Sequence, residues 1–325
     1  MRTITGFIDL QVNGFGGVDF SSPSLTEEAL ALAFRALVSR GTVAFLPTVI
    51  TSPLDVYRRN LPLIARVGRS DEFRGHVLGI HLEGPFISAE PGAVGAHDPR
   101  YVIAPDVALF LRLLDWADGT VKMLTLAAEI PGAESVAAAA VSAGLTVSIG
   151  HSLFDTTDLK RMSSAGACAL THLGNGLPNL LPRHPNPIWD GLADDAFTAM
   201  VISDGHHLPA STLKTIARAK GAERLVVVSD ASPVAGLPPG EYQVMGNQAV
   251  LEPSGRLHNP EKQCLVGSSA TMLECVNFLA SLGVFTPAEL LAVGYHNPLR
   301  LIGCAANEIG AGPGPMTFES GAFRL

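Results

Sequence analysis

The sequence is poor in charge and has no long apolar run, and both shortages exclude classes of protein. Charged residues make up 16% of the 325 residues, against about 25% in typical soluble domains. No apolar run reaches the ~18 residues that a membrane span requires, so we expect no membrane partner. The chain is 47% hydrophobic, which excludes disorder. Because surface shrinks relative to volume as a domain grows, this balance favours one large core.

Positive charge and cysteine are also scarce. The formal net charge is −8 and no Lys/Arg cluster occurs, so a nucleic-acid partner is not expected. The four cysteines, which form no C-x-x-C pair, are Cys168, Cys264, Cys275 and Cys304. They predict neither a structural zinc site nor a disulfide framework. The first ten residues lack the apolar stretch of a signal peptide, so a cytoplasmic location is predicted.

Short β-branched runs alternate with helical patterns over most of the chain. The predicted strands are Thr3–Val12, Val43–Ile50, Val77–Leu82, Val121–Ala127, Leu145–Ile149, Ala169–Thr171, Thr198–Ile202 and Leu225–Val228. Their continuous apolar character is typical of parallel strands buried on both faces. Eight such units in ~230 residues predict an α/β fold, a (β/α)8 TIM barrel. A doubly wound open sheet is the alternative, but no G-x-G-x-x-G follows the first strand.

Helices are predicted between these strands, and the chain changes character after them. The predicted helices are Thr26–Arg40, a helix opened by Ser52-Pro53, Asp106–Trp116, Ala133–Ala143, Thr156–Ala165 and Ala210–Ala219. We expect a single barrel domain, 1–325, with its core at 1–232. A hairpin excursion at 238–260, closing helices at 268–303 and a surface tail at 304–325 complete this division.

Polar residues stand where the predicted strands end. They are Gln11 and Asn13 after the first strand, Glu83 after the third, His151 after the fifth, His172 after the sixth and Asp230 after the eighth. The carboxyl ends of barrel strands converge on one mouth, where such enzymes place their active sites. Two imidazoles and one carboxylate are a common catalytic zinc set that leaves a position for water.

Not every strand-end residue needs a catalytic role. A carboxylate such as Asp230 can take a proton from water beside the metal and later deliver it to a leaving nitrogen. A single histidine is more often structural, but the shared topology of His151, His172 and Glu83 favours a site. Gln11 and Asn13 either hydrogen-bond the barrel rim or contact substrate or water.

These residues lie in motifs that resemble a known family. The segments H-L-E-G-P-F from His81, G-H-S from Gly150, T-H-L-G-N-G from Thr171 and V-S-D-A-S-P from Val228 are similar to those of the N-acetylglucosamine-6-phosphate deacetylases, in the amidohydrolase superfamily. Most superfamily members carry H-x-H after the first strand. Here Gln11 and Asn13 are poor metal ligands, so the chain resembles the single-metal branch.

The resemblance implies roles for particular residues. It implies one divalent metal ion, with Zn²⁺ expected first and Fe²⁺ or Co²⁺ as alternatives, and a homodimer. The implied metal ligands are Glu83, His151 and His172. The implied catalytic residues are Asp230, as acid/base, and His97, which polarises the acetamide carbonyl. The implied substrate contacts, beside Gln11 and Asn13, are Asn175, the Gly176 backbone and His207.

Two departures from the family pattern affect the prediction. The family usually has a small β-sandwich at its chain ends, so this chain resembles a short form that consists of the barrel alone. The family's phosphate-binding basic residue falls in L-P-R-H-P-N-P, where Arg183 or His184 can serve, although Arg183 is equally compatible with a solvated loop. We therefore expect a hydrolase that acts on a linear amide and removes the acetyl group of N-acetylglucosamine 6-phosphate. The alternatives are a non-phosphorylated or different N-acyl substrate and a non-catalytic sugar-binding barrel.

Overall fold

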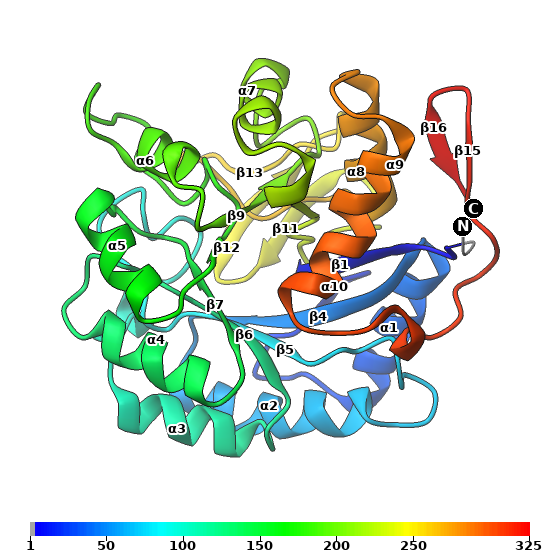
Figure 1. Ribbon diagram of the computed structural model, residues 1–325. Coiled ribbons are helices and arrows are strands. Elements are labelled where there is room, and N and C mark those ends of the chain that lie inside the picture. Colours follow the sequence, from blue (N-terminus) through cyan, green and yellow to red (C-terminus); the bar gives the residue numbers. More distant parts are fainter. Residues whose placement is uncertain (1–3) are drawn as a thin grey trace.

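The computed structural model describes residues 4–325 and contains one sheet of eight parallel strands surrounded by helices (Figure 1). In sheet order the strands are β1 (Phe7–Val12), β4 (Thr42–Ile50), β5 (Ile80–Glu83), β6 (Val121–Leu126), β7 (Thr146–Ile149), β8 (Ala169–Leu170), β9 (Thr198–Ile202) and β10 (Leu225–Val228). The first and last strands meet, because the Asn13 N–H donates to the Ala231 carbonyl at 2.8 Å. The predicted TIM barrel is confirmed.

The strand predictions differ from the structure mainly at their ends. All nine residues of β4 are buried, as expected of a strand covered on both faces. The third strand begins at Ile80 rather than Val77, which only bridges Phe45. Thr3, the predicted start of the first strand, lies outside the described residues. A small antiparallel pair that was not predicted, β2 (Gly14–Phe15) and β3 (Val18–Asp19), follows β1.

Helices cover the outside of the barrel (Figure 1). They are α1 (Glu27–Ser39), α2 (Leu54–Gly68), α3 (Val107–Trp116), α4 (Ala133–Ser142), α5 (Thr156–Ser164), α6 (Pro187–Ala193) and α7 (Ala210–Lys220). The helix α6 was not predicted, because its segment is rich in proline. Asn186 caps it, and Pro187 occupies the first helical position, where its missing N–H costs nothing. Short 3₁₀ turns span Pro99–Tyr101, Ala222–Arg224 and Ala306–Glu308.

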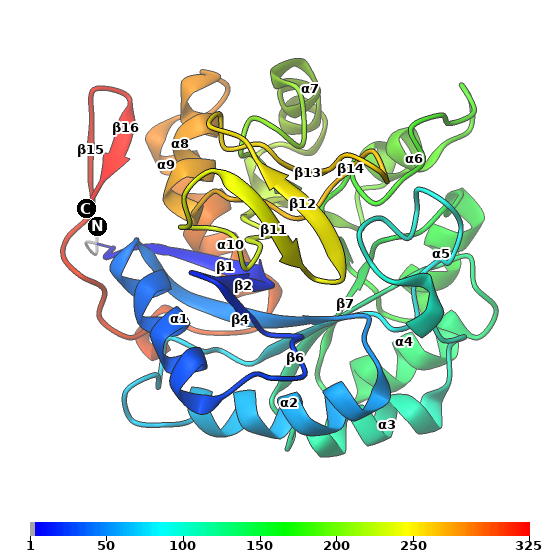
Figure 2. The same cartoon turned by 180° about the vertical axis from the view of Figure 1, so that it is seen from behind.

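The predicted hairpin excursion is a larger element than the sequence indicated. It is a four-stranded antiparallel sheet of β11 (Gly240–Val244), β12 (Asn247–Leu251), β13 (Leu257–Asn259) and β14 (Cys264–Leu265). The sheet thus extends beyond residue 260, and Figure 2 shows it in front of the barrel strands. The charged, proline-containing turn at 260–263 interrupts the alternation of polar and apolar residues, which is why the last strand was missed. A small cluster that includes Val244, Leu257 and Val266 forms its core.

The C-terminal part closes the barrel and ends in a hairpin. After α8 (Met272–Ser281) come α9 (Pro287–Leu291), a π-helical turn (Ala292–His296) and α10 (Asn297–Leu301). The predicted surface tail instead forms β15 (Thr317–Glu319) and β16 (Ala322–Arg324). Phe323 in β16 is buried and meets Phe7 edge to face, with ring centroids 5.2 Å apart. This contact joins the end of the chain to β1. Within residues 4–325, no helix is both long and apolar enough to cross a membrane.

Candidate active site

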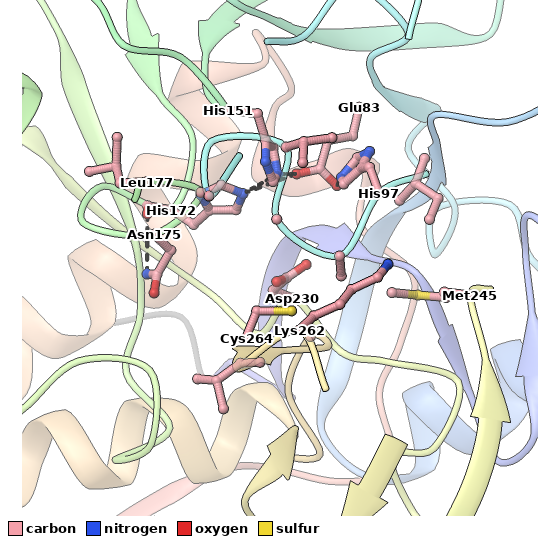
Figure 3. Close-up of a pocket in the computed structure, with 18 of the residues that line it drawn as sticks. Glu83, His97, His151, His172, Asn175, Leu177, Asp230, Met245, Lys262 and Cys264 are labelled. Carbon is pink, nitrogen blue, oxygen red and sulfur yellow. Dashed lines mark hydrogen bonds and ion pairs between the residues drawn. The ribbon is translucent and has the colours of Figure 1, made fainter. Parts of the chain in front are cut away.

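The ends of three barrel strands bring a carboxylate and two imidazoles together (Figure 3). Glu83 is the last residue of β5, and His151 and His172 each stand two residues beyond the end of β7 and β8. The Oε1 of Glu83 lies 3.2 Å from the Nε2 of His151 and 3.1 Å from that of His172, and the two Nε2 atoms are 3.1 Å apart. All three side chains are buried.

This geometry fits a single metal ion. Bonds of ~2.0–2.1 Å in a tetrahedral zinc site place ligand atoms ~3.3 Å apart, close to the separations found here. The Nδ1 of His151 is 2.8 Å from the Ala93 carbonyl, so Nδ1 carries the proton and Nε2 has a free lone pair. His97 lies beside the position that a metal ion would occupy, since its ligand atom lies within 4.8 Å of those of Glu83 and His151. The three contacts in the set with His172 are shorter, between 3.1 and 3.2 Å.

The two amides after β1 hold the carboxylates in place. The Nδ2 of Asn13 donates to Asp230 at 2.7 Å, and the Nε2 of Gln11 donates to Glu83 at 2.8 Å. Asn13 lines the cavity described below, whereas Gln11 is not among the residues that line it. The interaction of Gln11 is therefore with Glu83 and not with a ligand in the cavity.

Three residues at the site have an unusual backbone conformation. His151, His172 and Asp230 have φ angles of +49°, +33° and +52°. Positive φ is uncommon for residues other than glycine and is concentrated at functional sites, where the surrounding structure holds the strain. Each of these residues stands two positions beyond a barrel strand, so this turn directs the side chain across the barrel mouth. Gly176 packs against them, because a Cβ there would lie 2.9 Å from the His151 ring.

A cavity of about 580 Å³ opens above the cluster. The residues predicted to act that line it are Asn13, Glu83, His97, His151, His172, Asn175, Gly176, His207 and Asp230. Asn175 donates its side-chain amide to the His172 carbonyl at 3.2 Å. The tertiary structure thus brings together side chains from seven segments that are far apart in the sequence.

Burial and charge set the ionisation of the acidic groups. Burial opposes the charge on Glu83, but the adjacent His151 and His172 side chains outweigh it and keep the pKa of Glu83 well below its usual value. Burial and the nearby Glu83 carboxylate raise the pKa of Asp230 to about 6. Burial and His151 lower the pKa of His97 to about 3, so its imidazole is neutral at pH 7. The site therefore holds one firmly ionised carboxylate and one that exchanges protons more easily.

His207 is held in one orientation by Asp204, a carboxylate two residues beyond the end of β9. The Nδ1 of His207 lies 2.8 Å from the Oδ2 of Asp204, which also accepts from the Ser268 hydroxyl at 2.7 Å. With Nδ1 engaged, Nε2 is the ring nitrogen that a ligand in the cavity can reach. Asp204 follows β9 as Asp230 follows β10, and this shared position was the signal for its role.

The structure does not bring the two basic residues after α5 into the cavity. Arg183 and His184 are exposed and do not line it, although Asn179 of the same loop does. The sequence reasoning also missed Met245 and Lys262, which line the cavity from the sheet β11–β14. No motif marks these two residues, because their place depends on how that sheet packs over the barrel.

A (β/α)8 barrel with a Glu/His/His set and a further carboxylate at the carboxyl ends of its strands is the architecture of a metal-dependent amidohydrolase. No family model matches the chain. The N-acetylglucosamine-6-phosphate deacetylase of Bos taurus is 36% identical over 308 residues, which are 92% of this chain and 74% of that protein. The chain therefore belongs to the N-acetylglucosamine-6-phosphate deacetylase family.

Two further comparisons bear on the substrate of the family. The N-acetylgalactosamine-6-phosphate deacetylase of Shewanella sp. (strain ANA-3) is 33% identical, over 86% of this chain and 68% of that protein. The fold matches a variant of the N-acetyl-D-glucosamine-6-phosphate deacetylase of Mycobacterium smegmatis in complex with N-acetyl-D-glucosamine-6-phosphate. That match has a TM-score of 0.87 and 27% identity, and it covers 99% of this chain and 84% of the other.

Proposed function

We propose that the protein hydrolyses the acetamide of N-acetylglucosamine 6-phosphate and releases acetate and glucosamine 6-phosphate. The observation that carries the proposal is the Glu83–His151–His172 set in the same cavity as Asp230 and His97. With a metal ion bound, such a cavity would combine a Lewis acid, a proton carrier and a hydrogen-bond donor around one point, and these are the groups that amide hydrolysis needs. Membership of a deacetylase family supports the same reaction.

We propose Zn²⁺ as the metal ion, held by Glu83, His151 and His172. When bound, a divalent metal lowers the pKa of water and polarises a carbonyl group as a Lewis acid. The same donor set also suits Fe²⁺ and Co²⁺. Gln11 fixes the Glu83 carboxylate and Ala93 fixes the His151 ring, so the donor atoms are oriented before an ion arrives.

Asp230 is the proton carrier in this proposal. Its carboxylate takes a proton from the attacking water and delivers it to the nitrogen of the departing amine. Asn13 donates to one of its oxygens and leaves the other for this exchange. The raised pKa of Asp230, about 6, brings its proton affinity near that needed at neutral pH.

Side chains that line the cavity orient the substrate. His97 donates a hydrogen bond to the acetamide oxygen as negative charge develops there, which a neutral imidazole can do through its N–H. His207, oriented by Asp204, and Asn175 contact the sugar, and the Gly176 backbone approaches it closely because no Cβ intervenes.

Acetate release and metal content test the proposal together. We expect purified protein with one bound divalent ion to release acetate from N-acetylglucosamine 6-phosphate, with one amine formed for each acetate. Metal analysis identifies the ion. A metal-replete protein that releases no acetate from any N-acetylhexosamine or its 6-phosphate would exclude the proposal. Tight sugar binding without turnover would instead favour a binding protein.

The galacto epimer is a second candidate substrate, since a relative at 33% identity is named for it. The same assay with N-acetylgalactosamine 6-phosphate decides between the two epimers by the ratio of their kcat/KM values. A higher kcat/KM for either unphosphorylated sugar would favour the non-phosphorylated alternative.

We also propose that the protein acts as a homodimer in the cytoplasm. Leu180 is 90% exposed in the loop before α6 and Trp189 is 51% exposed on α6, so each offers a second copy an apolar side chain to cover. The four cysteines are free thiols, in keeping with a reducing compartment. Light scattering of the purified protein tests the dimer, and a monomer at micromolar concentration would contradict it.

A further inference from the structure

We propose that Ile50 and Met245 form a wall, the acyl wall, that limits the N-acyl group of the substrate to acetyl by closing off a second cavity that a longer chain would enter. Ile50 is the last residue of β4, and Met245 lies in the turn between β11 and β12. The inference rests on the proposed function and deepens it, because it assigns the residues that select the acyl group.

The first step is the position of the second cavity, which has a volume of about 500 Å³ and adjoins the active-site cavity. Ile50 and Met245 are the two described residues that line both cavities. Ile50 pairs with Glu83 across β4 and β5, so it stands beside a proposed metal ligand. Beyond the acyl wall, the lining includes the apolar side chains of Val234 and Leu237. A hydrocarbon chain that passed the wall would therefore find apolar surface there.

The second step is that the reacting groups direct the acyl chain toward this wall. Figure 3 shows His172 and Asn175 on one side of Asp230, and His97 and Met245 on the other side. In the proposed reaction Asp230 serves the amide nitrogen, which carries the sugar, and His97 serves the oxygen of the carbonyl, which carries the acyl chain. A sugar on the side of Asn175 therefore leaves the acyl chain on the side of Met245.

The third step is that one short segment, which begins in β3, holds the backbone of both wall residues. The Ile50 N–H donates to the Ser21 hydroxyl at 3.0 Å, and the Ser21 N–H donates to the Asp19 carboxylate at 2.8 Å. The Met245 N–H also donates to Asp19. On the other side of Ile50, the Tyr57 hydroxyl donates to its carbonyl at 3.0 Å. Because the backbone is fixed at both positions, the two side chains decide how wide the passage is.

The two halves of the acyl wall differ in stiffness. Ile50 is 5% exposed and branched at Cβ, so it has few rotamers. Met245 is half-buried and unbranched, but its turn is held: it has a φ of +49°, and the Asn247 side chain donates to its carbonyl at 2.8 Å. The same amide donates to the Ala96 carbonyl at 2.9 Å, which ties the turn to the segment that carries His97. Met245 is therefore the half that substitution opens most easily.

The test compares two acyl groups on the same sugar phosphate. We expect the wild type to favour N-acetyl- over N-butanoylglucosamine 6-phosphate by about 10²-fold in kcat/KM. Met245→Ala should raise the butanoyl-to-acetyl ratio of kcat/KM by about 10- to 100-fold, and Ile50→Val, which removes one methylene, by about 4-fold. Leu177→Ala shortens an apolar side chain on the His172 side of the same cavity, so it should leave the ratio unaltered. A wild type that hydrolyses both substrates equally well, or an unaltered ratio in both wall variants, would overturn the inference.

A binding measurement separates this inference from the proposed function. Acetate release by the wild type with an unaltered ratio in the variants would overturn the acyl wall alone. If the metal-loaded wild type releases no carboxylate from either sugar, the proposed function fails, and calorimetry with the same two sugars then decides the role of the wall. A preference of the wild type for the N-acetyl sugar that Met245→Ala removes would support the wall. Equal binding of the two sugars by the wild type, binding of neither, or a preference that survives in the variant would overturn it.

Discussion

The floor and the rim of the cavity are built in different ways. The floor, which consists of Glu83, His151, His172 and Asp230, comes from barrel strand ends and is at most 9% exposed. The rim consists of the loops 179–186 and 260–263, which are largely exposed and belong to no barrel strand. The hydrogen-bonded strands that precede the floor residues restrict their positions, as bond making requires. Recognition of a distant group tolerates looser loops, so the rim is where specificity can change.

The largest effect should follow from removal of the metal or of a floor ligand. Glu83→Gln replaces the charged donor by a neutral amide of the same shape, so we expect bound metal and acetate release both to fall to background. Metal analysis alongside the assay checks this, with Glu28→Gln on the exposed face of α1 as the matched control. Full activity after exhaustive chelation would contradict the prediction, because it would show that the reaction at the floor needs no metal ion.

Asp230→Asn should abolish proton transfer while it preserves the floor. The Asn13 hydrogen bond has an acceptor in either side chain, so metal content should stay at the wild-type level. We expect kcat to fall by about 10²- to 10⁴-fold, the range of general acid–base catalysis. Wild-type turnover with bound metal in this variant would remove Asp230 from the mechanism.

Asp9 lies on β1 outside the set of floor residues, and its ionisation should affect the free energy of unfolding and not turnover. It is fully buried on β1, where it accepts from the Ser229 N–H, and burial raises its pKa to about 7 from an ordinary 3.8. The folded state therefore holds a proton that the unfolded state loses above pH ~4. The stability from this proton is complete below pH ~4 and is lost as pH rises to about 7, on the order of 1 kcal/mol per pH unit.

Denaturant unfolding at several pH values checks this prediction. Asp9→Asn should flatten the decline in the free energy of unfolding between pH 4 and 7, since an amide does not titrate there. Parallel pH profiles for the wild type and the variant would show that Asp9 is ionised in the folded barrel.

The effect of Asp204→Asn should be intermediate between the effects expected at the floor and at the rim, because Asp204 acts through His207. The variant replaces the acceptor at Oδ2 by a donor and disturbs the His207 ring orientation. We expect KM to rise by about 10-fold with a smaller change in kcat, as for the loss of one hydrogen bond to substrate. Steady-state kinetics with both constants resolved checks this. A loss confined to kcat would place His207 among the groups that act on the reacting bond.

Arg183→Met should have the smallest effect of the five. Since Arg183 is exposed outside the cavity, we expect kcat/KM for the phosphorylated sugar to stay close to the wild-type value. The measurement is the ratio of kcat/KM for the phosphorylated sugar over the unphosphorylated one, made at a protein concentration where the oligomeric state is known. A selective loss of activity with the phosphorylated sugar would show that the loop 179–186 reaches a substrate. The loop would then contribute to recognition of the phosphate group.

The floor could be predicted because its geometry follows from strand topology. Glu83, His151, His172 and Asp230 each stand at the carboxyl end of a predicted parallel strand, and closure of the barrel is enough to make them neighbours. The C-terminal hairpin was not predicted, since short Gly/Pro-rich strands lack periodicity and gain their stability from Phe323 against Phe7. The helix α6 was missed for a related reason, because its prolines are typical of a loop until Asn186 is seen to cap it.

The sequence by itself determined the barrel, the family and the residues of the floor, because apolar periodicity and strand-end motifs are local signals. Only the tertiary structure decided that Gln11 holds Glu83, that Asp204 orients His207 and that Lys262 lines the cavity. Each of these relations joins residues from separate loops or sheets. Such relations depend on how the excursion and the loops pack on the barrel, and no spacing along the chain records that packing.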